Sequence, residues 1–302
     1  MKKKLTIAIL TSLLFTNSAY AGHHDKAKET IIKSTKVTEN IYMLEGEGGN
    51  IGVLKGNDRT ILIDAEFGHL SEKIKKAVKN ISDKPISFLL NTHFHFDHTD
   101  GNKNFAKDGV QLISHKNVHK RLKEGSYIKE FKKIIDPAKK ESLPILTYES
   151  NINLYQNGEE VEMIHYPKAH TDGDTAVFFK NSNVIHTGDL YFSRIYPFVD
   201  VSNGGSVEGA INALESIIKR SNNDTKIIPG HGKLSNLKQL KKDLVMLKEM
   251  SALIEKAAKN NEDKNKLLSN PVVKKYHPTY GKGVFTTERF IEVMYDNYKL
   301  GK

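Results

Sequence analysis

Thr92-His93-Phe94-His95-Phe96-Asp97-His98-Thr99-Asp100-Gly101 places four potential metal ligands within six residues, at the spacing H-x-H-x-D-H. Imidazole and carboxylate groups are preferred ligands of zinc and of neighbouring divalent metals. A strand that ends in a tight loop can direct all four side chains to one point. Buried without a metal, the same groups would be several poorly satisfied polar groups in one place. The stretch therefore predicts a metal site.

Three further candidate ligands follow downstream, each at a loop-like position after an apolar run. They are His170 in the stretch 169–174, Asp189 shortly after Val184 and Ile185, and His231 shortly after Ile227 and Ile228. Together with the first cluster they make five histidines and two aspartates. This number of ligands is enough for two metals with room for a water.

The order and spacing of these motifs resemble the metallo-β-lactamase-fold superfamily of metallohydrolases, from about residue 40 to about residue 258. The resemblance implies two zinc ions per chain, with manganese and iron left open, and catalytic roles for Asp97 and Asp189. It further implies that Asp189 bridges the two metals, with a water or hydroxide between them. The implied ligands are His93, His95 and His170 for one metal, and Asp97, His98 and His231 for the other.

The same resemblance implies a hydrolase that uses a metal-bound hydroxide to cleave an ester, thioester, lactone or amide-type bond. His95 stands where iron-binding relatives typically have Glu, which favours zinc and hydrolysis. Asp189 stands where the commonest zinc β-lactamases have Cys, and this chain has no Cys. A carboxylate at this position resembles glyoxalase II, lactonase and phosphodiesterase-type relatives.

Two alternatives stay open at this point. Asp97, His98 and His231 also match the second-metal ligands of another β-lactamase subclass, so a class B-like metallo-β-lactamase that hydrolyses β-lactam antibiotics is the first. The second is a non-catalytic metal-binding protein, which would hold the same ligands without an open coordination position.

Two groups of short apolar runs, each followed by helical patterns, predict an α/β fold built as a four-layer αββα sandwich. A helix is expected over 71–80 with Ser71 as its cap, and a final helix from Thr286. Residues 115–143 are expected to be helical pieces with a lysine-rich insertion, and 271–283 a loop. The expected strands are 41–44, 51–54, 61–63, 86–90, 110–114, 161–165, 176–179 and 184–185.

The sequence pattern at the N-terminus predicts that the protein is exported. Lys2, Lys3 and Lys4 precede a short apolar core and an A-x-A site ending at Ala21, as in a secretory signal peptide. We therefore expect a signal peptide over 1–21, a catalytic domain over 22–258 and a C-terminal helical extension over 259–302. The mature chain would be periplasmic or secreted, without a stable membrane span.

The formal net charge is +10, and loss of the signal segment would remove three lysines and no acid, leaving +7. Because the lysines are scattered rather than grouped with aromatic residues, and because the chain is expected to be exported, no nucleic-acid partner is predicted. The partner is expected to be a small-molecule substrate.

The loop 190–198 leaves Asp189 directly and is expected to form one wall of the substrate groove. Tyr191, Arg194 and Tyr196 are its candidate substrate-binding residues, although the aromatic rings could instead pack in the core beneath the loop. Arg194 would suit a carboxylate, so the substrate is expected to carry an anionic group. His186, three residues before Asp189, is a candidate for orienting a ligand, and the resemblance implies that Asp64 orients a ligand histidine.

Overall fold

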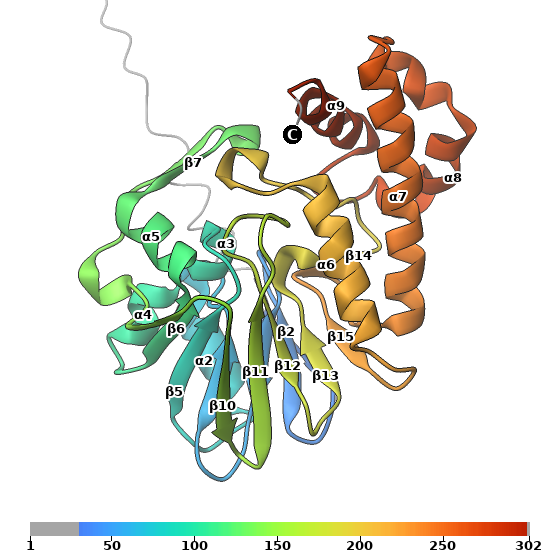
Figure 1. Ribbon diagram of the computed structural model, residues 1–302. Helices are drawn as coiled ribbons and strands as arrows, with labels where there is room; N and C mark the ends of the chain where they lie inside the picture. The colour runs from blue at the N-terminus through green and yellow to red at the C-terminus, as the bar shows by residue number, and fades with distance from the viewer. Residues whose placement is uncertain (1–29, 301–302) are drawn as a thin grey trace, which may run out of the picture. The chain divides into compact units, whose positions relative to one another are not determined.

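Two β-sheets form the centre of the computed structural model, which describes residues 30–300 (Figure 1). Within that range the first sheet has seven strands, in the order β1-β2-β3-β4-β5-β6-β9. Neighbouring strands are antiparallel from β1 to β4 and parallel from β4 to β9. The strands are β1 (Lys33–Lys36), β2 (Ile41–Glu45), β3 (Ile51–Leu54), β4 (Thr60–Ile63), β5 (Ile86–Asn91), β6 (Gln111–His115) and β9 (Leu146–Tyr148).

The second sheet has six strands among the described residues, in the order β10-β11-β12-β13-β15-β17. They are β10 (Asn151–Gln156), β11 (Glu159–His165), β12 (Thr175–Phe179), β13 (Val184–His186), β15 (Lys226–Ile228) and β17 (Ser235–Asn236). Two short pairs lie outside both sheets. They are the antiparallel hairpin β7 (Ser126–Ile128) and β8 (Lys133–Ile135), and the parallel pair β14 (Phe192–Ser193) and β16 (His231–Gly232).

The two sheets bury their facing sides against each other. Buried β-branched and aliphatic side chains of both sheets form one cluster, and each contributes roughly 1.5–3 kcal/mol through its burial. The cluster includes Ile41, Leu54, Ile63 and Leu90 from the first sheet, and Val161, Met163, Val177 and Val184 from the second. Helices cover the outer faces, so the predicted four-layer αββα sandwich is confirmed (Figure 1).

The helices follow the expected apolar stripes. Ile74 and Val78 are buried on α2 (Ser71–Lys79). Leu214 and Ile217 on α6 (Val207–Lys219) pack in a cluster with α7 (Leu237–Lys259) and the second sheet. Within the described range, no helix is both long and apolar enough to cross a bilayer. The α-helices are α2 (Ser71–Lys79), α3 (Phe96–Thr99), α4 (Asn102–Ala106), α5 (Lys116–Glu124), α6 (Val207–Lys219), α7 (Leu237–Lys259), α8 (Pro271–Tyr280) and α9 (Thr287–Lys299).

The expected cap at Ser71 is wrong. The 3₁₀ turn η1 (Gly68–Leu70) runs directly into α2, so the chain is already helical at Leu70 and Ser71 is the first residue of the helix. Its Oγ accepts a hydrogen bond from Asn104 Nδ2 at 3.0 Å instead. Ser71 thus ties α2 to α4 and does not cap the helix.

Two segments differ from expectation. The insertion at 115–143 contains the hairpin β7–β8 after α5, joined by the 3₁₀ turn η2 (Lys129–Phe131). Residues 271–283, expected to be a loop, contain the helix α8. Pro271 begins this helix, where no backbone donor is needed, and Asn270 Oδ1 accepts a hydrogen bond from Val272 N at 2.9 Å. The last helix is as predicted, since Thr286 caps α9.

Candidate metal centre and substrate groove

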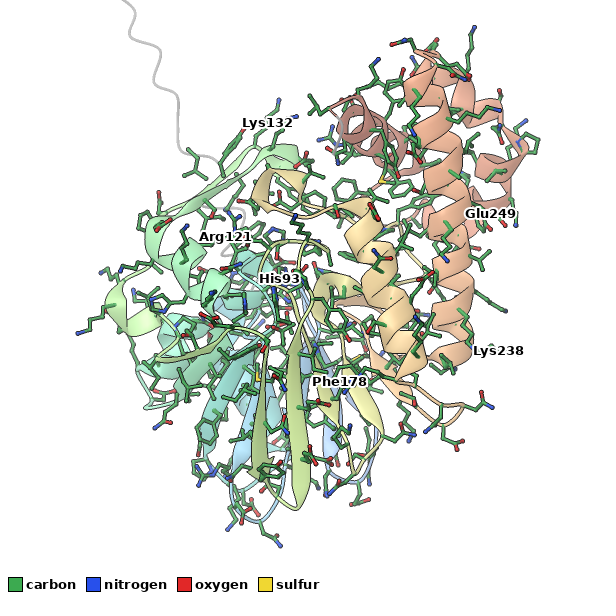
Figure 2. All side chains as sticks on the ribbon, in the orientation of Figure 1. His93, Arg121, Lys132, Phe178, Lys238 and Glu249 are labelled. Atoms are coloured by element: carbon green, nitrogen blue, oxygen red, sulfur yellow. The ribbon has the colours of Figure 1, made fainter. Side chains whose placement is uncertain are left out.

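The H-x-H-x-D-H stretch leaves the end of β5 and turns at once into the single helical turn α3. This turn projects Asp97 and His98 toward the same side as His93 and His95. Figure 2 shows His93 at one end of the strands, where the loops gather. The sharp turn is held by Asp64, whose two carboxylate oxygens accept hydrogen bonds from Thr92 N and Thr92 Oγ1, each at 2.7 Å.

The second sheet supplies the other three candidates from its own strand ends. His170 follows β11, Asp189 lies in the 3₁₀ turn η4 (Gly188–Leu190) after β13, and His231 begins β16 after β15. Loops from both sheets therefore converge at one edge of the sandwich. The seven residues predicted as metal ligands are brought together by chain segments more than one hundred residues apart.

These seven side chains form two sets. Within each set, one ligand atom per residue lies within 4.8 Å of every other. The first set is His93, His95, His170 and Asp189, and the second is Asp97, His98 and His231. The first set is fully buried, whereas Asp97 and His231 are partly exposed.

Asp189 lies between the two sets. Its Oδ2 is 3.7 Å from His93 Nε2 and 3.5 Å from His170 Nε2. Its Oδ1 is 3.1 Å from His98 Nε2 and 3.4 Å from His231 Nε2. One carboxylate oxygen thus faces each set, which is the arrangement that a bridging ligand requires.

The donor atoms fit a bound cation. Within residues 30–300, His93 Nε2 and Asp189 Oδ1 are buried and have no hydrogen-bond partner, a costly condition for polar atoms. His95 Nδ1 and His170 Nε2 face each other at 2.9 Å. Converging lone pairs of this kind are satisfied by a divalent metal, and nitrogen and carboxylate donors suit zinc.

Two buried aspartates orient the ligand rings from behind. Asp64 Oδ2 lies 2.8 Å from His98 Nδ1, as the sequence predicts, and Asp64 itself adopts a left-handed backbone conformation (φ 67°). Asp200 Oδ2 lies 2.9 Å from His95 Nε2, so His95 presents Nδ1 to the site. The sequence carries no signal for Asp200, because it lies 105 residues from His95 outside every motif.

Among residues 30–300, His186, the other predicted orienting residue, makes its hydrogen bonds to backbone groups and not to a ligand side chain. Its Nε2 donates to the Asn50 carbonyl oxygen at 3.1 Å, and its Nδ1 accepts from Gly188 N at 3.2 Å. Because Gly188 immediately precedes Asp189, His186 supports the backbone of the bridging residue. Its effect on the site is therefore indirect.

Burial lowers the pKa of His170 to about 4 and that of His93 well below its usual range, which keeps both rings neutral and able to donate a lone pair. Burial opposes ionisation of Asp97, but His98 and His231 outweigh it and lower the pKa of Asp97 to about 2. Burial likewise opposes protonation of His231, whereas Asp189 and Asp97 raise its pKa to about 10. Metal binding at the second set would therefore displace protons.

A groove of about 210 Å³ opens onto this centre. His95, Asp97, Asp189 and His231 form its floor, and its walls are largely aromatic. Of the three predicted substrate residues, only Tyr196 lines it. A larger surface depression of about 490 Å³ beside β12 and Arg220 is lined by none of the predicted ligands.

Tyr191 and Arg194 lie elsewhere than predicted. Tyr191 is buried in the core, where its hydroxyl donates to Asp243 Oδ2 at 2.6 Å and lies 2.8 Å from Ser235 Oγ. The Arg194 guanidinium donates to Ser193 Oγ at 3.3 Å and does not line the groove. The reason is local: side chains alternate along the extended strand β14, and the left-handed conformation of Arg194 (φ 61°) turns the chain after it.

The model of the metallo-β-lactamase superfamily matches residues 44–231. The chain is similar to a protein described as "Probable metallo-hydrolase" from Methanocaldococcus jannaschii, with 29% identity over 185 residues, 59% of this chain and 85% of the relative. It is also similar to the hydroxyacylglutathione hydrolase of Pelagibacter ubique, with 28% identity over 163 residues, 52% of this chain and 57% of the relative. The second match thus spans little more than half of that protein.

Among solved structures, the fold is similar to that of a metallo-β-lactamase from Pontibacter korlensis. The TM-score is 0.61 at 15% sequence identity, and the match covers 72% of this chain and 99% of the other. At this level of identity the likeness concerns the fold alone. It agrees with the two-sheet architecture.

Proposed function

Because the chain belongs to the metallo-β-lactamase superfamily, we propose that it is a dinuclear zinc hydrolase that cleaves an ester, thioester, lactone or amide-type bond. Family membership and the two ligand sets establish a metallohydrolase. The observation that carries the finer proposal is Asp189, whose two oxygens face two separate ligand sets. A single-metal site would leave the second set of Asp97, His98 and His231 without a role.

The seven candidate ligands divide between two proposed metal positions. His93, His95 and His170 would hold one zinc ion, Asp97, His98 and His231 the other, and Asp189 both. When bound, two such ions lower the pKa of a coordinated water to about 7 and polarise the oxygen of the bond to be cleaved. Manganese or iron could occupy the same nitrogen and oxygen donors, and zinc is proposed because five of the seven ligands are histidines.

The protein's own groups then position the reaction. Asp64 and Asp200 fix which ring nitrogen of His98 and His95 faces the centre. Asp97 and Asp189 are the two carboxylates on the groove floor. The pKa of Asp189 is held far below its usual range, since His231, His98 and His93 outweigh the effect of burial. Its carboxylate therefore stays ionised and can accept a hydrogen bond from an attacking water. The aromatic walls exclude other water.

The chain has no cysteine, so no thiolate nucleophile is available. We also propose that the protein is exported and acts in the periplasm or outside the cell. The supporting pattern, residues 1–21, lies outside the described residues and rests on the sequence alone. N-terminal sequencing of the protein recovered from an envelope fraction should begin at Gly22.

A class B-like β-lactamase is the second candidate, favoured by Asp97, His98 and His231, which match the second-metal ligands of one β-lactamase subclass. A non-catalytic metal-binding protein is disfavoured because the groove opens onto four of the seven ligands. The deciding experiment is turnover by the metal-loaded protein of a panel of esters, thioesters, lactones, phosphodiesters, nitrocefin and a carbapenem. Asp189→Ala is the matched inactive control. Turnover of a carboxylic ester, thioester or lactone supports the proposal, whereas turnover of lactams alone supports the second candidate.

A further inference from the structure

The groove wall facing the metal centre is a cluster of three phenylalanine rings. Phe198 and Phe285 are stacked, with ring centroids 5.2 Å apart and planes 10° from parallel. Phe131 meets both rings edge-on, at 5.2 Å from Phe198 and 5.7 Å from Phe285. We call these three residues the aromatic wall. It stands directly beside the first ligand set, because the His170 and Phe198 rings are 5.5 Å apart.

Three distant segments build the aromatic wall. Phe131 comes from the turn of the β7–β8 hairpin, Phe198 from the loop after Asp189, and Phe285 from the connection between α8 and α9. Two hydrogen bonds hold the hairpin in place. Arg289 on α9 donates to the Glu130 carbonyl oxygen at 2.8 Å, and Asn203 Nδ2 donates to the Tyr127 carbonyl oxygen at 3.0 Å. The wall is therefore assembled before a ligand enters.

The wall offers no positive charge. Within residues 30–300, no lysine or arginine lines the groove. Lys133, on the hairpin, lies over the Phe96 ring at 4.8 Å from its centroid and is not among the lining residues. Of the described residues in the lining, Glu47 is the one acidic residue besides the predicted ligands, and it lies 3.1 Å from His69. A carboxylate on this side of a substrate would lose water without gaining a partner, which is unfavourable.

The groove extends outward along further apolar side chains. Val284, at its rim, is 79% exposed, and Ile195 and Ile128 lie deeper. At about 210 Å³ the groove is smaller than the roughly 300–1,000 Å³ typical of drug-sized ligands. Its dimensions therefore suit one ring or a short alkyl chain next to the bond that is cleaved.

We infer that the aromatic wall binds an uncharged, apolar group of the substrate, aryl or short alkyl, and selects against a carboxylate on that group. This inference rests on the proposed function, since it names the substrate class of the same groove. It replaces the expectation of an anionic substrate, which depended on Arg194. It also gives the C-terminal segment a role in specificity, because Val284 and Phe285 belong to it.

The test separates binding from turnover. We would measure Kd by NMR titration for three amide analogues: N-methyl-4-phenylbutanamide, N-methylhexanamide and the N-methylamide of adipic acid, whose far end carries a carboxylate. The two neutral analogues should bind about tenfold or more tightly than the anionic one. Loss of one aromatic contact should weaken binding of the phenyl analogue about tenfold, as expected for burial of part of a ring.

The variants are Phe285→Ala and, because Phe285 is buried, Val284→Asp at the exposed rim. Both should weaken binding of the phenyl analogue. Tyr155→Ala, an exposed aromatic residue on β10 outside the groove lining, should not. Equal or tighter binding of the carboxylate analogue would overturn the inference, as would unchanged binding in both groove variants.

Turnover of the corresponding phenyl esters distinguishes a failure of this inference from a failure of the proposed function. Hydrolysis without a preference for the neutral acyl groups would leave the proposed function intact and overturn the inference. Selective binding of the neutral amides without hydrolysis of any ester would support the inference about the wall and count against the proposed bond class.

Discussion

The two sides of the groove are positioned by different parts of the fold. The metal side consists of loops that leave the ends of neighbouring strands, so its ligands are gathered by the sheets themselves. The aromatic wall consists of a hairpin turn, a loop and a helix connection that only tertiary packing brings together. In the function and the inference proposed above, chemistry and selectivity are therefore assigned to separate parts of this molecule. Changes to one side should leave the other largely intact.

The largest effect is expected at the bridging residue. Asp189→Ala removes the contact shared by both ligand sets, so kcat/KM on any substrate should fall about a thousandfold or more, as for the loss of several kcal/mol of transition-state stabilisation. Circular dichroism should stay unchanged, since the core lies between the sheets. Asp83→Ala, at an exposed aspartate, is the control. A fully active Asp189→Ala enzyme would show that the metal side does not depend on a bridge.

A smaller effect is expected at Asp200, which contacts the candidate ligand His95 and is not itself a candidate ligand. Asp200→Asn keeps the size of the side chain that holds His95 Nε2 but removes its charge. Metal affinity should fall about ten- to a hundredfold, the usual range for partners of ligand histidines. Competition with a chromophoric chelator measures this, with the exposed Asp224→Asn as control. Unchanged affinity would mean that Asp200 only shapes the loop 200–203.

The same contrast explains what could be predicted from the sequence. Most strands of the two sheets and the convergence of the seven candidate ligands were predictable because apolar runs end at polar residues of recognisable spacing, and strand ends of one sheet edge meet in space. Asp64 could be found because it directly follows β4, at a position that the family resemblance associates with orienting a ligand histidine. Asp200 could not be found, because its contact with His95 depends on how a loop after Asp189 folds back.

The aromatic wall could not be predicted from the sequence, for a related reason. Phe131 and Phe285 lie in segments with weak local patterns, one expected to be helical and one next to a stretch expected to be a loop. The prediction that Tyr191 and Arg194 line the groove depended only on their position shortly after Asp189 in the sequence. Strand alternation and one left-handed residue direct them elsewhere. Proximity in sequence to a metal ligand is therefore weak evidence for contact with the substrate.

Tyr191→Phe should affect stability and leave the groove intact. The change removes the buried hydroxyl that lies between Asp243 and Ser235. The free energy of unfolding should fall by about 1–3 kcal/mol, because buried polar groups lose a partner. Denaturant unfolding of wild type and variant measures this, and kcat/KM should be unchanged. A large loss of kcat/KM without a loss of stability would contradict this prediction and indicate that Tyr191 contacts the substrate.

The smallest effect is expected at Arg194. Since its guanidinium contacts Ser193 and does not line the groove, Arg194→Ala should change kcat/KM by no more than about twofold, the scale of an ordinary surface substitution. The comparison requires matched neutral and anionic substrates. A selective loss on the anionic substrate would place a cation at the groove and break the distinction between the two sides.

Metal stoichiometry tests the central claim most directly. Protein purified without a chelator and analysed by elemental mass spectrometry should contain about two equivalents of divalent metal per chain, mainly zinc, by the two-metal logic of the ligand sets. Removal of the metal should abolish hydrolysis, and addition of two equivalents of zinc should restore it. A stable content of one equivalent with full activity would contradict the account, because Asp189 would then bridge nothing.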